Sequence, residues 1–187
     1  MERQEVEDWL EGHPEAVHAD PHLLLDRAER EVRAHAEEEA WLRARSIVES
    51  HLCHFQESFG LPASDAFVAK EVCHELAREL RKREPSPGAE TGRLSESLLR
   101  ALDAPARGLL AEWTADLARR EEHRAWLEVV RFTDHLARTL QRGGELSDAL
   151  SWDFAHSYPR TAERIVRLLM REYEARARGP ELVDDIE

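Results

Sequence analysis

The amino-acid sequence predicts an all-α protein: a helical bundle built from two pseudo-repeated αα-hairpins, with a short helix before them. Three observations support this prediction. Apolar residues recur at steps of three and four along most of the chain, which is the spacing of one face of an α-helix. No segment alternates apolar and polar residues with the period of two that is typical of a strand. Finally, one set of residues occurs twice in the same order, once in each half of the chain.

The repeat consists of small groups of matching residues. In the first copy they are Ala40-Trp41-Leu42, His51-Leu52, Gln56, Gly60, Ser64-Asp65-Ala66 and His74. In the second copy they are Ala125-Trp126-Leu127, His135-Leu136, Gln141, Gly144, Ser147-Asp148-Ala149 and His156. The offset between the copies shortens slightly from the tryptophans to the last histidines. Each copy contains a long helical run, a corner with glycine and a second run that starts at Ser-Asp, which is the pattern of an αα-hairpin.

Residues 1–19 are predicted to form an acidic helix over 4–12 and a turn, because Gly12-His13-Pro14 ends a helical pattern. Asp20-Pro21 predicts the start of the next helix, since Asp can cap it and Pro suits its first position. The run from His22 to Phe59 contains no helix breaker, so it is either one helix or two helices with a bend near 34–37. Its later apolar stripe is Trp41, Ala44, Val48, Leu52, Phe55 and Phe59.

The first hairpin is assigned to residues 20–83, with a corner at Gly60-Leu61-Pro62 and a return helix over 65–83. Residues 84–91 are rich in Pro, Ser and Gly, which favours a hinge or a mobile loop. A short helix is expected over 94–102.

The second hairpin is assigned to residues 104–178. Its long helix ends at Gly143-Gly144, and its later stripe is Trp126, Val129, Val130, Thr133, Leu136 and Leu140. Pro159 is expected to break the return helix at Tyr158, because a residue before proline avoids the α region. Thr161 is expected to cap a last helix. Residues 20–180 are taken as one bundle domain, followed by an acidic tail, 181–187.

The net charge of −13 is concentrated at the two ends. Residues 1–40 hold 13 acidic residues against four arginines, and residues 181–187 hold four acidic residues and no base, which leaves 41–180 neutral. A surface that binds nucleic acid needs clustered bases, and Arg81-Lys82-Arg83 at a helix end is the nearest approach to one. Nucleic acid and anionic membranes are therefore not the expected partners.

Metal binding is the most specific chemistry that the sequence suggests. Two acid-x-x-His motifs, Glu71-x-x-His74 and Asp153-x-x-His156, lie at matching places of the two copies. Glu49 and Asp134 precede them on the partner helices, and His51 lies close by in the sequence. This inventory resembles the di-iron carboxylate bundles of the ferritin-like kind, in which two helices give one Glu each and two give Glu-x-x-His.

The helical phase opposes an iron site of this kind, whose ligands must point into the bundle. At about 100° per residue, Glu71 and His74 point away from the apolar stripe of their helix, and so does His156. A zinc site is a second alternative, because imidazole and thiolate are zinc ligands. Its residues would be His51, Cys53, His54, Cys73 and His74.

Other catalytic patterns are missing from the sequence. It contains no G-x-S-x-G, no H-E-x-x-H and no glycine-rich phosphate loop. The sequence therefore favours a non-enzymatic protein that needs no cofactor and that binds another protein or itself. Trp152, which lies off its helix stripe, and Trp9 are the candidate contact residues. The lack of an apolar leader or membrane span and the presence of only two cysteines favour a cytoplasmic protein.

Overall fold

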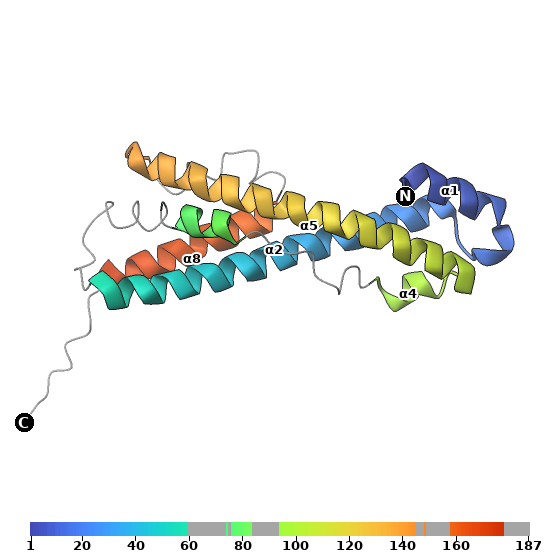
Figure 1. The fold of residues 1–187 in the computed structure, drawn as a ribbon, viewed down its shortest axis with the longest axis horizontal. Coiled ribbons are helices and arrows are strands. Elements are labelled where there is room, and N and C mark those ends of the chain that lie inside the picture. Colours follow the sequence, from blue (N-terminus) through green and yellow to red (C-terminus); the bar gives the residue numbers. More distant parts are fainter. Residues whose placement is uncertain (60–73, 75, 84–93, 145–147, 149–157, 178–187) are drawn as a thin grey trace, which may run out of the picture. The chain divides into compact units, whose positions relative to one another are not determined.

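The computed structural model describes residues 1–59, 74, 76–83, 94–144, 148 and 158–177. Its named elements are α1 (Arg3–Gly12), the 3-10 helix η1 (Pro14–Ala16), α2 (Pro21–Phe59), α4 (Glu96–Leu99), α5 (Ala104–Gln141) and α8 (Pro159–Ala177) (Figure 1). Residues 76–82 are also helical. In this described part the only β-type pairing is one isolated bridge, between Val17 and Leu102. The predicted all-α fold class is therefore confirmed.

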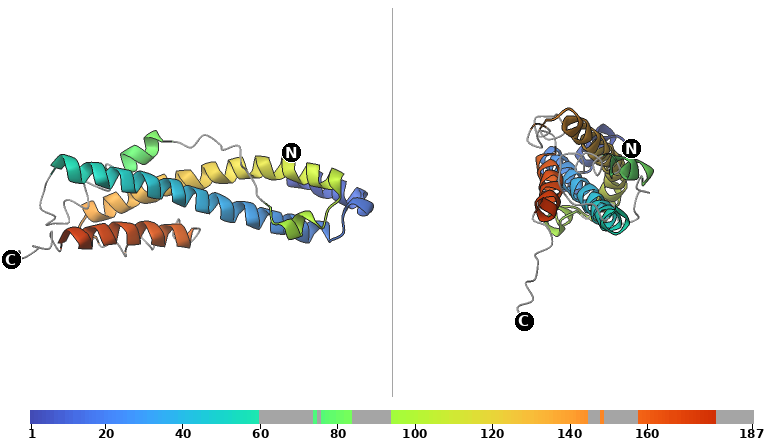
Figure 2. Two further views of the ribbon diagram at one scale, coloured as in Figure 1. Left: turned by 90° about the horizontal axis from the view of Figure 1, so that it is seen from below. Right: turned by 90° about the vertical axis from the view of Figure 1, so that its left-hand side faces the viewer.

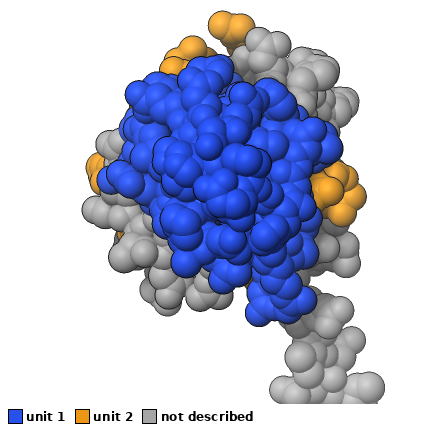
Figure 3. All heavy atoms as spheres, turned by 90° about the vertical axis from the view of Figure 1, so that its right-hand side faces the viewer, with its two compact units in different colours: residues 1–40, 85–126 blue, residues 41–84, 127–187 orange. Residues whose placement is uncertain are grey.

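The chain divides into two compact units (Figure 3). Unit 1 comprises residues 1–40 and 85–126, and unit 2 comprises residues 41–84 and 127–187. Each long helix contributes its first part to unit 1 and its second part to unit 2. Each predicted hairpin likewise contributes to both units. No helix among the described residues is long and apolar enough to cross a membrane.

The helix α2 is continuous from Pro21 to Phe59, so the first of the two alternatives for this run is the observed one. It begins where the sequence predicts. Oδ1 of Asp20 accepts hydrogen bonds from the backbone N–H of His22 at 2.9 Å and of Leu23 at 3.4 Å. These bonds satisfy two of the N–H groups that a helix start leaves without partners. Pro21 occupies the first helical position, where no N–H is needed.

Unit 1 has a core to which α1, α2, α4 and α5 all contribute. Its buried residues are Val6, Leu10, Ala16, Val17, Leu24, Leu25, Ala28, Val32, Leu98, Leu102, Ala106, Leu110, Trp113, Leu117 and Ala118. Within this unit α2 and α5 run parallel from the same end (Figure 2). The Val17–Leu102 bridge lies just before their first turns, and Arg33 and Glu121 form an ion pair further along, at 3.8 Å.

The bridge in unit 1 has local two-fold symmetry. The N–H of His18 donates to the carbonyl of Ala101 at 2.8 Å, and the N–H of Asp103 donates to the carbonyl of Ala16 at 3.0 Å. We call the step along the chain from Trp41 to Trp126 the repeat offset. The same step leads from Ala16, Val17 and His18 to Ala101, Leu102 and Asp103, so it exchanges the two bonds. The two residues paired in the bridge, Val17 and Leu102, are therefore one repeat offset apart.

Burial along the two long helices follows the same register. Most buried residues of α2 have a buried residue one repeat offset later, in α5. In α2 these residues are Leu25, Ala28, Val32, Ala40, Trp41, Ala44, Ile47 and Val48. The residues one repeat offset later are Leu110, Trp113, Leu117, Ala125, Trp126, Val129, Phe132 and Thr133, and all are buried. Within this span Ala36 is the exception, because its counterpart is the half-buried Glu121. The two helices therefore present apolar faces in matching phase.

Unit 2 contains the second parts of α2 and α5, the helical residues 76–82 and α8. Its buried residues include Trp41, Ala44, Ile47, Val48, Leu76, Leu80, Val129, Phe132, Leu136, Ala162, Ile165 and Val166. The predicted stripes are confirmed wherever the structure describes their side chains. Thr133 is also fully buried, and its hydroxyl donates to the carbonyl of Val129 at 2.9 Å, so its polar group is satisfied.

Three predicted boundaries change. The helix expected over 94–102 is shorter, Glu96–Leu99, because the chain leaves it to reach the bridge at Leu102. The helix α8 begins at Pro159 rather than at a cap by Thr161, since proline fits a first helical turn. Thr161 is buried in that turn. The long helix α5 ends at Gln141, just before the predicted corner, and Gly143 there adopts a positive φ of 77°, which glycine tolerates best.

Some predictions fall on residues outside the described part of the chain. These are the corner at 60–62, most of the return helix 65–83, the loop 84–91, the helix start at Ser147 and the tail 181–187.

Candidate functional site

The predicted metal ligands are only partly described. Glu49 is exposed on α2, where Arg45 donates to its carboxylate at 2.7 Å, and Asp134 is half-buried on α5, where it pairs with Arg81. His74 is half-buried. His51 lies within α2, but its side chain is outside the described residues, as are Glu71, Asp153 and His156. No group of three or more metal-binding side chains occurs in the described part.

Of the two candidate contact tryptophans, Trp9 lies in the described part of the chain. Trp152 lies outside the described residues. Trp9 is half-buried in α1 and stacks on His13, with ring centroids 4.1 Å apart and an interplanar angle of 13°. The Nδ1 atom of His13 also lies 2.8 Å from the carbonyl oxygen of Trp9. One face of the Trp9 indole is therefore covered by His13 at the end of α1.

The repeated Ala-Trp-Leu triplet has the same burial pattern in both copies. Ala40 and Trp41 are buried, as are Ala125 and Trp126. The leucine that follows is exposed in each case: Leu42 retains 46% of its surface and Leu127 retains 38%. Both leucines belong to unit 2. The sequence held the signal for this, because the residue after a core tryptophan points about 100° away from it on a helix.

In unit 2 the guanidinium of Arg164 on α8 lies 5.5 Å from the centroid of the Trp41 ring. This is a cation–π distance, and such a contact contributes about 0.5–1 kcal/mol where it is exposed. It ties α8 to α2 at the start of the first repeat copy.

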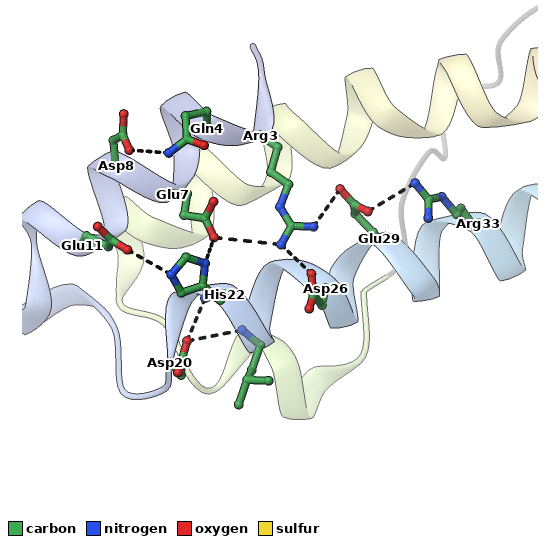
Figure 4. Close-up of polar contacts among 11 residues, drawn as sticks. Arg3, Gln4, Glu7, Asp8, Glu11, Asp20, His22, Asp26, Glu29 and Arg33 are labelled. Carbon is green, nitrogen blue, oxygen red and sulfur yellow. Dashed lines mark hydrogen bonds and ion pairs between the residues drawn. The ribbon is translucent and has the colours of Figure 1, made fainter.

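In unit 1 a group of charged side chains joins α1 to the first turns of α2 (Figure 4). Arg3 of α1 donates to Asp26, and its other terminal nitrogen lies 3.3 Å from Glu29. Glu29 also pairs with Arg33 at 3.3 Å. The hydrogen bond from the Arg3 guanidinium lowers the pKa of Asp26. Arg3 therefore fixes the first turn of α1 against the second turn of α2.

His22 lies at the other end of this charged group, between two carboxylates of α1 (Figure 4). Its Nδ1 forms an ion pair with Glu7, and its Nε2 lies 3.3 Å from Glu11. Glu7 is only 6% exposed and is also 4.0 Å from Arg3, whereas Glu11 is exposed. We call Arg3, Glu7, Glu11, His22, Asp26, Glu29 and Arg33 the α1–α2 charge cluster. The sequence prediction missed it, although acids four residues apart on α1 already marked one polar edge.

A second polar contact in unit 1 holds the start of α4 against α2. The backbone N–H and the hydroxyl of Ser95 both donate to Glu31, each at 2.8 Å, and Arg27 donates to Glu31 at 3.1 Å. Burial by itself would raise the pKa of Glu31, but these bonds to the carboxylate outweigh it and the pKa is lowered. Glu31 is therefore ionised at neutral pH and acts as a structural clamp.

No family model matches the chain, and neither a curated protein nor a solved structure matches it.

Proposed function

We propose that this chain is a non-enzymatic helical module, acting in the cytoplasm, that binds another protein or a second copy of itself. The observation that carries the proposal is the exposure of Leu42 and Leu127 at the same position of the two copies. A single exposed leucine is ordinary on a protein surface. Two exposed leucines in equivalent places, each following a buried tryptophan, favour an apolar contact surface on each copy.

The repeat itself is part of the proposal: two hairpins, 20–83 and 104–178, whose long helices match at the repeat offset. Three observations support it. The hydrogen bonds of the Val17–Leu102 bridge exchange under the repeat offset, and the buried positions of α2 and α5 keep that offset. The third is in unit 2, where residues from the return segments of both hairpins contact the other hairpin's long helix: Arg81 pairs with Asp134, and Arg164 lies over Trp41.

Substitution of the two leucines tests the binding function. The double variant Leu42→Arg, Leu127→Arg should keep the melting temperature of the wild type, because both side chains are already exposed. Its affinity for a partner found by pull-down, or its self-association in analytical ultracentrifugation, should fall by about tenfold or more, the effect of losing about 1.4 kcal/mol. Binding titrations measure the first quantity and sedimentation equilibrium the second.

Leu23→Arg is the matched control. Leu23 is more exposed than either leucine, at 67%, but the residue one repeat offset later is Gly108, so it has no equivalent in the second copy. It should leave binding and self-association unchanged. Equal losses in the control and in the double variant would mean that any added charge weakens binding, and the leucine surface would be rejected.

Metal analysis of the purified protein separates this proposal from a metal-binding bundle. We expect iron and zinc well below one equivalent after purification without a histidine tag. One or more equivalents of metal, lost on changing His74 and His156 together to Ala, would contradict the binding-module proposal. The result would favour an iron or zinc protein with a redox or metal-sensing role.

A further inference from the structure

The attachment of α1 to α2 in unit 1 has two parts. Val6 and Leu10 are buried in the core, at 0% and 1% exposure. Around them lie the charged contacts of the α1–α2 charge cluster, in which α1 supplies Arg3, Glu7 and Glu11 (Figure 4). The apolar contacts do not depend on pH. The charged contacts include one group, His22, of the residue type whose charge changes near neutrality.

The geometry of His22 makes its charge state matter. Each ring nitrogen faces a different carboxylate of α1, Nδ1 toward Glu7 and Nε2 toward Glu11. A neutral imidazole carries one N–H and can donate to only one of them. An imidazolium carries two N–H groups, one on each nitrogen that faces a carboxylate. Only the protonated ring therefore presents an N–H to both carboxylates.

The burial of Glu7 makes the charge of His22 energetically important. Its carboxylate is nine-tenths buried, and a buried charge without a compensating cation is costly. The other cation in reach is Arg3, 4.0 Å away, and Arg3 already serves Asp26 and Glu29. With a neutral His22, Glu7 would share one guanidinium with two further carboxylates.

Carboxylates face His22 from both helices that meet at this contact. From α1 they are Glu7 and Glu11. From α2 they are Asp26, one turn further on, and Asp20, whose carboxylate accepts the backbone N–H of His22. Arg3 is a cation that faces the same carboxylates, Arg30 also acts on Asp26, and Arg33 pairs with Glu29.

We propose that α1 is a latch controlled by a proton: protonated His22 holds α1 on α2 through Glu7 and Glu11, and loss of that proton loosens α1. The direction follows from the geometry of the ring: proton binding tightens the latch, and proton loss weakens it. It involves α1 and α2 in unit 1, and it does not depend on the partner-binding proposal.

Amide hydrogen exchange in the full-length protein tests the latch, with protection factors of residues 4–12 corrected for intrinsic exchange at pH 5.5 and pH 8.0. Wild-type protection of α1 should fall about 2- to 5-fold between these values, since solvent around the exposed His22 ring screens its pairing with Glu7. In His22→Gln the fall should vanish. Glu7→Gln, which keeps the shape and removes the buried charge, should reduce it.

His18→Gln is the matched control, because His18 is exposed in the same unit and faces Asp103 at 3.1 Å rather than α1. It should retain the wild-type fall in α1 protection. The proposal is overturned if wild-type α1 shows no fall, or if His22→Gln and Glu7→Gln both keep it. Because the measurement needs no partner, its failure would leave the leucine-surface proposal untouched, and the reverse also holds.

Discussion

At the scale of single residues, Trp41 and Trp126 are large side chains that match between the two copies. Trp41 is 9% exposed and Trp126 is 2% exposed. Changing either to Ala removes most of its buried surface and leaves a cavity, so each change should lower the free energy of unfolding by about 3–5 kcal/mol. Urea denaturation measures this. A loss below about 1 kcal/mol would mean that the indole contributes little packing in solution.

His135 on α5 provides a pH prediction. Burial lowers its pKa first, and the nearby Arg138 and Arg142 lower it further. The unfolded chain then binds this proton at higher pH than the folded chain does, because in the unfolded chain the histidine titrates at its ordinary pKa of about 6.5. The stability contribution is complete above about pH 6.5 and is lost as the pH falls below it.

The variant His135→Gln should therefore lose less stability than the wild type between pH 7.5 and pH 5.5. Urea midpoints at the two pH values give the difference, and the other histidines cancel because both proteins carry them. Parallel losses in the two proteins would show that His135 does not link folding to protons.

At the scale of elements, the start of α2 depends on one side chain. Asp20 accepts two backbone N–H groups of the first turn. Asp20→Ala should lower the free energy of unfolding by about 0.5–2 kcal/mol, the usual effect of losing an N-cap. Asp8→Ala is the control, since Asp8 is exposed inside α1 and Ala is the best helix former. If both variants unfold at the wild-type urea concentration, the cap is not stabilising.

At the scale of the whole molecule, charge is unevenly distributed. Residues 1–40 carry −9 and residues 181–187 carry −4, while the rest is neutral. If these ends steer a basic partner, association should slow as salt rises, because exposed charges are screened beyond about 8 Å at physiological ionic strength. Removing 181–187 should lower the association rate and leave the melting temperature unchanged.

Stopped-flow binding at two salt concentrations, with and without the tail, measures both effects. An association rate that responds to neither change would leave the acidic ends with a role in solubility alone.

The sequence by itself determined the helical class, the start of α2 and the phase of its apolar stripes. These features depend on residues close together in the chain: Asp20 caps N–H groups two and three residues away, and a stripe such as Trp41, Ala44 and Val48 follows from about 3.6 residues per turn. The repeat offset is likewise a property of the sequence, because it is counted between matching residues such as Trp41 and Trp126. The helix boundaries predicted from the sequence were less accurate at α4 and α8, where tertiary contacts and Pro159 set them.

Only the tertiary structure decided which side chains meet. Nothing local indicates that Arg3 lies beside Asp26 and Glu29, that His22 lies between Glu7 and Glu11, or that Val17 pairs with Leu102. Likewise, a metal-ligand spacing cannot say whether Glu49 and Asp134 are available, and each has an arginine partner. Such contacts depend on how whole helices pack, because a buried carboxylate needs a charged partner and that partner can come from a distant part of the chain.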